Sequence, residues 1–245
     1  MDILDHGGYQ IDLSIIEDDA GAISTGHLPI PDAVRAAVND AYEQFRSVTD
    51  GANASYYPAL AQVDPDYFGI AIAGSSGELF TIGDVDVSFT IMSIAKPFVL
   101  ALVLESLGAE RVRELVGVNA TGYAFNSVIP VERSGGRLSN PMVNAGALAT
   151  TSLMPGANSH EKWHAIVDGL SRFAGRKLEL HKEVFASASQ SNVRNRALVN
   201  LLSSYDRIYG DPMETLDLYT RQSSLAVTAR DLGLMGATLA NGGVH

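Results

Sequence analysis

The chain has 245 residues, of which 46% are hydrophobic and 18% charged, so its composition is that of a soluble globular protein with a sizeable core. The 28 Asp and Glu residues outnumber the 17 Lys and Arg residues and give a net charge of −11. Because the basic residues are also scattered along the sequence, nucleic acid is not expected as a partner. The absence of cysteine excludes disulfides, a thiol nucleophile and thiolate metal sites. We expect no metal and no organic cofactor.

The sequence also favours a cytoplasmic location without membrane attachment. Its first five residues include two aspartates and no basic residue, and they lack the basic start and apolar core of a secretory signal. The longest apolar run, residues 94–104, is interrupted by Lys96 and is too short to cross a bilayer.

In chain order, the elements begin with an extension over residues 1–30, rich in glycine, acidic residues and proline. Pro31 opens a helix-spaced apolar pattern that runs to about residue 46, and a domain over 31–245 follows the extension. Alternating apolar residues predict short strands, which are 67–73, 79–82 and 87–91. The remainder is mainly helical, with helices expected over roughly 108–117, 141–153, 160–174, 192–205 and 228–241. A few antiparallel strands followed by many helices indicate an α+β fold.

The last predicted strand leads directly into Ser93-Ile94-Ala95-Lys96, at the start of a helix that is apolar nearly all round. An apolar environment lowers the pKa of a lysine, and a neutral amine one turn from a serine can remove the proton of the hydroxyl. The helix N-terminus also favours developing negative charge. A plain helix cap for Ser93 and a surface-seeking side chain for Lys96 are the alternatives.

Two asparagines and two tyrosines are further candidates. Asn144 interrupts an apolar run, so its amide either ties down backbone or faces a ligand. Asn195 precedes an apolar helical run, where a capping or surface role is the simpler interpretation. Tyr56 and Tyr219 could donate hydrogen bonds, although packing in the core is the default for tyrosine.

Several motifs together carry a family resemblance. They are Ser93-Ile94-Ala95-Lys96, Phe125-Asn126-Ser127, Asn140-Pro141-Met142-Val143-Asn144-Ala145-Gly146-Ala147, Arg194-Asn195 and Leu239-Ala240-Asn241-Gly242-Gly243. In this order they resemble the serine-dependent glutaminases of bacteria, to which the mammalian kidney-type and liver-type enzymes are related. The resemblance begins at about Gly26 and continues to the last residue.

The resemblance implies hydrolysis of L-glutamine to L-glutamate and ammonia on a fold similar to serine β-lactamases and penicillin-binding proteins, an antiparallel sheet with a helical region. Ser93 matches the nucleophile, Lys96 its activating lysine, and Tyr56 a tyrosine that passes protons to the leaving ammonia. Asn144, Asn195 and Tyr219, together with Ser93, match the residues that hold glutamine. By the same analogy we expect a homo-oligomer, either a dimer or a tetramer.

Two departures from the family pattern stand out. Seven residues before its Arg-Asn asparagine the family has a substrate-binding glutamate, whereas this chain has Ala188. Family members also continue past Ala-Asn-Gly-Gly with Gly-Met-Tyr-Asp and Lys-Ser-Gly-Val-Gly-Gly segments, which supply another tyrosine, an edge strand and an oxyanion donor. The printed sequence stops at His245 before these segments.

These departures leave alternatives beside a glutaminase. The sequence could be part of a longer product, or the protein could be a catalytically impaired relative that binds an amino acid or a partner subunit. Another acyl-serine amidase on the same fold is a further alternative, although the matching motifs extend well beyond Ser93 and Lys96.

Overall fold

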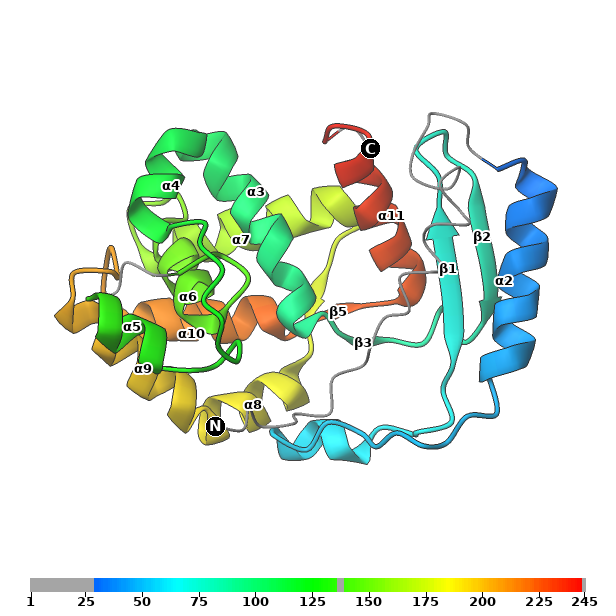
Figure 1. The fold of residues 1–245 in the computed structure, drawn as a ribbon, viewed down its shortest axis with the longest axis horizontal. Coiled ribbons are helices and arrows are strands. Elements are labelled where there is room, and N and C mark those ends of the chain that lie inside the picture. Colours follow the sequence, from blue (N-terminus) through cyan, green and yellow to red (C-terminus); the bar gives the residue numbers. More distant parts are fainter. Residues whose placement is uncertain (1–28, 136–138, 244–245) are drawn as a thin grey trace, which may run out of the picture.

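An antiparallel hairpin forms one side of the molecule. In the computed structural model, which describes residues 29–135 and 139–243, β1 (Gly69–Ala73) pairs with β2 (Leu79–Gly83). The turn between them uses Gly77 at a φ of 95°, a backbone conformation that favours glycine. Helix α2 (Pro31–Phe45) lies along β2 and helix α11 (Ala229–Ala240) lies along β1 (Figure 1).

A second, shorter sheet leads the chain into the Ser93 motif. Strands β3 (Phe89–Thr90), β5 (Leu225–Val227) and β4 (Glu179–Leu180) are antiparallel, in the order β3-β5-β4. One residue beyond β3, the Ile91 N–H donates to Leu225 O at 2.9 Å. This bond fixes the approach to a 3₁₀ turn, η2 (Met92–Ile94), from which α3 (Ala95–Leu107) continues.

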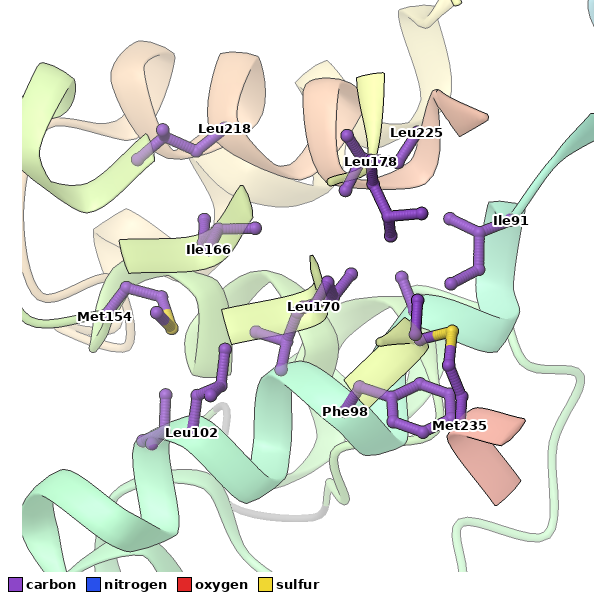
Figure 2. Close-up of a cluster of buried hydrophobic side chains, with 14 of the residues drawn as sticks. Ile91, Phe98, Leu102, Met154, Ile166, Leu170, Leu178, Leu218, Leu225 and Met235 are labelled. Atoms are coloured by element: carbon purple, nitrogen blue, oxygen red, sulfur yellow. The ribbon is translucent and has the colours of Figure 1, made fainter. Parts of the chain in front are cut away.

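Helix α3 is the centre of the main hydrophobic core. Figure 2 shows Phe98 and Leu102 of α3 among side chains from α7 (Ser159–Ala174), α11 and the short sheet. Gly169 of α7 permits close contact between the two helices, because a β-carbon there would lie 2.4 Å from the Leu102 side chain. The prediction that this helix is buried among apolar side chains is therefore confirmed. Its first turn, which carries Lys96, is buried as well.

The remaining helices complete a helical region beside the two sheets (Figure 1). They are η1 (Pro58–Gln62), α4 (Ala109–Val116), α5 (Ile129–Ser134), α6 (Asn144–Ser152), α8 (Lys182–Ser191), α9 (Val193–Ser204) and α10 (Pro212–Ser223). A second hydrophobic cluster joins α6, α9 and α10 through Leu148, Val199 and Leu216.

The predicted α+β class is confirmed, with differences in individual elements. Among the described residues three α-helices were not predicted, α5, α8 and α10. Helix α10 nevertheless has a clear start signal, because Asp211 caps it and Pro212 is its first residue. The helix expected from residue 141 begins at Asn144, because the Asn140 side chain accepts from the Met142 N–H in a local turn. The extension expected at 1–30 lies outside the described residues except for its last two.

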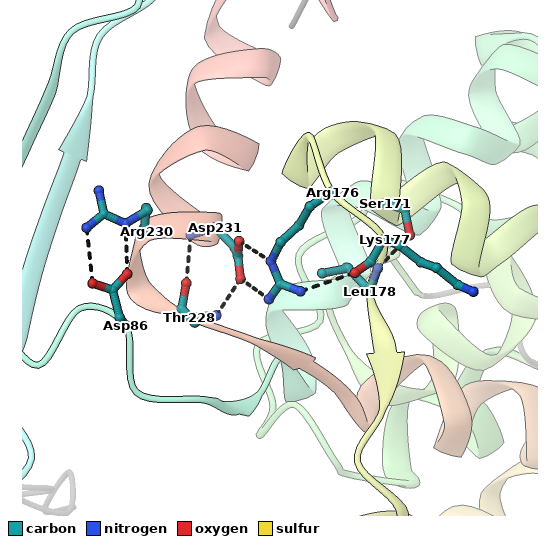
Figure 3. A network of polar contacts seen from close by, with 8 residues as sticks. All are labelled: Asp86, Ser171, Arg176, Lys177, Leu178, Thr228, Arg230 and Asp231. Carbon is teal, nitrogen blue, oxygen red and sulfur yellow. Dashed lines mark hydrogen bonds and ion pairs between the residues drawn. The ribbon is translucent and has the colours of Figure 1, made fainter.

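A polar network fixes the start of α11. Thr228 and Asp231 form a reciprocal capping box, and Arg176 donates to Asp231 through Nε at 2.7 Å (Figure 3). Burial alone raises the pKa of the Asp231 carboxyl, but hydrogen bonds from Arg176 and Thr228 outweigh it and hold that pKa below its ordinary value. A second pair, Arg230 and Asp86, joins α11 to the segment before β3.

No single helix in residues 29–135 and 139–243 is long and apolar enough to cross a membrane. The segments Met92–Leu107 and Ala109–Val116 are long and apolar enough only when taken together, and the chain bends by 120° between them. No group of three or more His, Cys, Asp or Glu side chains in the same residues is arranged to hold a metal ion.

The start of α6 predicts a strong constraint at Gly146. A β-carbon there would lie 1.9 Å from Asn140 O and 2.8 Å from Ser139 Oγ. Because the obstacle is backbone, we expect Gly146→Ala to lower the free energy of unfolding by about 3 kcal/mol in urea denaturation. The matched control is Gly236→Ala in α11, where a β-carbon meets no atom within 4 Å. It should be neutral or stabilising by up to about 1 kcal/mol, and equal costs at the two sites would contradict the account.

Candidate active site

Ser93 is presented at a strained junction between strand and helix. The preceding residue, Met92, has a φ of 48°, which is unusual for a residue other than glycine. Ser93 itself is exposed. The N-cap of α3 is Ile94 and makes no side-chain capping bond, so the simple capping role considered for Ser93 is wrong.

Lys96 lies one turn further along, and its side chain is held by two acceptors. Only 5% of the residue is exposed. Its Nζ donates to Met142 O at 3.1 Å and to Asn144 Oδ1 at 2.8 Å. Burial lowers the pKa of Lys96 to about 8, because an apolar environment disfavours the charged amine. The side chain therefore does not extend to solvent, as the alternative interpretation supposed.

Asn144 connects this lysine to the two other predicted binding residues. Its Nδ2 donates to Asn195 Oδ1 at 3.1 Å, and its Oδ1 also accepts a longer bond of 3.4 Å from the Tyr219 hydroxyl. Because each end of the Asn144 amide has a different partner, the network fixes which way that amide points. Burial, with smaller contributions from Tyr57 and Tyr56, raises the pKa of Tyr219, which keeps its hydroxyl protonated.

Asn195 does not have the capping or surface role that its local sequence favours. Asn192 is the N-cap of α9, and Asn195 is buried in the first turn with its amide facing Asn144. The packing of α9 against α6 produces this burial, and the sequence around Asn195 does not encode it locally.

Ser93 and the predicted binding residues line a pocket of about 260 Å³, whereas Lys96 lies behind Asn144 and is not among the lining residues. Besides Ser93, the lining includes four predicted site residues, which are Tyr56, Asn144, Asn195 and Tyr219. Ala188 also lines the pocket. Ala188 is buried, so its methyl group forms part of the wall where the family pattern has a carboxylate. Among the residues that line this pocket in the described parts of the chain, none is acidic.

Further polar residues line this pocket beside the predicted site residues, among them Tyr57 and Asn192. Tyr57 lines it beside Tyr56, and the two rings meet edge to face with centroids 4.8 Å apart. Asn192 is buried and donates to Thr220 Oγ1 at 3.1 Å. Its position two residues before the Arg194-Asn195 motif is the sequence feature from which its place in the pocket could have been predicted.

Phe125, from the Phe125-Asn126-Ser127 motif, interacts with both Asn144 and Lys96. The Phe125 carbonyl accepts from the Asn144 N–H at 2.8 Å, which fixes the first residue of α6. The Phe125 ring lies 5.7 Å from Lys96 Nζ, a distance at which the ring face attracts the cation.

Comparison with known proteins identifies the family. The glutaminase family model matches residues 51–245. Glutaminase 2 of Yersinia pestis is 54% identical over 223 residues, which cover 91% of this chain and 66% of that protein. A glutaminase of Colwellia psychrerythraea is 48% identical over 217 residues, covering 89% and 70%. The chain therefore belongs to the glutaminase family, as its motifs predict.

Solved structures agree with this assignment. The structure of a probable glutaminase, ybaS, superposes with a TM-score of 0.85 at 42% identity, covering 87% of this chain and 69% of that one. The structure of Mglu in its tris and glutamate form gives 0.81 at 38% identity, covering 89% and 48%. The chain spans 66% to 70% of the length of the two curated relatives named above.

Proposed function

We propose that this protein hydrolyses L-glutamine to L-glutamate and ammonia, with Ser93 as the nucleophile and Lys96 as the base. Membership of the glutaminase family supports the substrate. The observation that carries the mechanism is a buried Lys96 amine one turn from the exposed Ser93. Its Nζ donates to two neutral acceptors, and one of them, Asn144, lines the same pocket as Ser93.

The two bonds suit a neutral amine. A neutral amine has two N–H donors and one lone pair, and Met142 O and Asn144 Oδ1 take both donors. The lone pair is then free to accept the hydroxyl proton of Ser93. With a pKa of about 8, roughly one Lys96 side chain in ten is neutral at pH 7.

The reaction then follows in two halves. The Ser93 Oγ bonds to the side-chain amide carbon of glutamine while its proton moves to Lys96. When the C–N bond breaks, a proton passes to the leaving nitrogen, with Tyr56 as the relay, and ammonia departs. Water then cleaves the glutamyl ester on Ser93, which releases glutamate and returns the hydroxyl its proton.

Asn195 and Tyr219 orient the substrate in this proposal. The Oδ1 of Asn195 is used by Asn144, so its Nδ2 is left to donate to an acceptor on glutamine. Tyr219 has a raised pKa and keeps its proton, which it donates to Asn144 Oδ1, so its oxygen is left to accept from a donor on glutamine. A fold like that of the serine β-lactamases and assembly as a homo-oligomer remain predictions from the family resemblance, and a cytoplasmic location remains a prediction from the sequence.

The first test is removal of the nucleophile. We expect Ser93→Ala, in the intact protein as the cell makes it, to lower ammonia release from L-glutamine by about 10³-fold or more. Since Ser93 is exposed and its hydroxyl bonds to none of the described residues, the thermal midpoint should not change. Ammonia release by the variant at the original rate, or none by the parent protein, would contradict the proposal.

Position 188 provides a second test, because it lines the pocket without a charge. We expect Ala188→Glu to lower KM for L-glutamine by about tenfold or more, since a carboxylate there can pair with the α-amino group. The matched control, Ala188→Gln, has nearly the same shape but no charge. An unchanged KM in Ala188→Glu, or an equal drop in both variants, would overturn the charge argument.

A further inference from the structure

Helix α7 has two exposed histidines one turn apart, His160 and His164. Residues four apart share one face of a helix, and here the two Nε2 atoms are only 3.1 Å from each other. The rings lie with centroids 4.4 Å apart and planes at 60°. With Glu161 between them they form an H-E-x-x-H pattern, which our expectation of no metal overlooked.

The pattern does not form the active site of a zinc peptidase. In such a site the glutamate is the general base, but here the Glu161 carboxylate accepts from the Ala157 N–H and from Asn158 Nδ2, both at 2.9 Å. It therefore helps to cap the start of α7. No α7 residue is among those that line the Ser93 pocket.

The distance between the rings suits a shared metal ion. With metal–nitrogen bonds of about 2.05 Å, two ligands are about 2.9 Å apart at a right angle and about 3.3 Å apart at the tetrahedral angle. The observed 3.1 Å lies between these values. We propose that His160 and His164 form a bidentate binding site for a divalent transition-metal ion on the exposed face of α7.

The ligand set defines the kind of ion and its binding. Imidazole nitrogens favour Cu²⁺, Ni²⁺ and Zn²⁺ over Mg²⁺ or Ca²⁺. Within the described residues no third His, Asp or Glu completes a group, so water fills the remaining positions. The ring that has its proton on Nε2 moves it to Nδ1 through solvent, and both Nε2 lone pairs then face the ion. Because protonated imidazole cannot bind, affinity falls as the pH is lowered.

The site is separate from the proposed chemistry, so metal binding is its direct measurement. We expect the full chain, without an affinity tag, to bind Ni²⁺ at this site in isothermal titration. His160→Gln or His164→Gln should each weaken that binding by about tenfold or more. Mg²⁺ should give no heat attributable to this site. In the unaltered chain, Cu²⁺ should broaden the ring NMR signals of His160 and His164.

A matched control separates geometry from histidine content. The double variant His164→Gln with Asp168→His keeps the number of histidines on α7, but it places the two rings about 12 Å apart along the axis. It should bind as weakly as His164→Gln alone. Parental affinity in that double variant or in both single variants, or no Ni²⁺ binding by the parent protein, would overturn the proposal.

Discussion

The burial of one lysine amine is the constraint on which the candidate active site depends. Lys96 lies on the first turn of α3, the most apolar of the described helices, where a charged amine is poorly solvated and its pKa falls to about 8. The protein does not relieve this cost with a carboxylate, since both acceptors of Lys96 Nζ are neutral, a backbone carbonyl and an amide. A carboxylate would restore the ordinary pKa and remove the base, so the neutral partners are consistent with the proposed role.

Much of the surrounding architecture holds those two acceptors in place. Asn144 is the first residue of α6, and its position is set by the Phe125 carbonyl and by the close approach of Gly146 to Asn140. On the opposite side, β5 holds the segment that leads to Ser93. The helix after β5 begins at the network of Arg176, Thr228 and Asp231. Elements distant in sequence therefore converge on a short segment around Ser93 and Lys96.

The parts of this arrangement that sequence predicts are those with a local cause. The apolar helix after Ser93 and the strands expected over 67–73 and 79–82 are encoded by neighbouring residues, and the structure contains them. The burial of Asn195 and Asn192 is not local, because it arises when α9 packs on α6 and α10. The short strands β4 and β5 have too few residues for a pattern to be visible.

The ionisation of Lys96 is the most direct test of this account. In the intact protein, the Nζ resonance of Lys96 can be followed by NMR as the pH is raised, and its absence in Lys96→Met assigns it. We predict a midpoint of about 8, well below that of the exposed lysines. A midpoint near the ordinary lysine value of about 10.4 would leave fewer than about one amine in a thousand neutral at pH 7 and would contradict its role as the base.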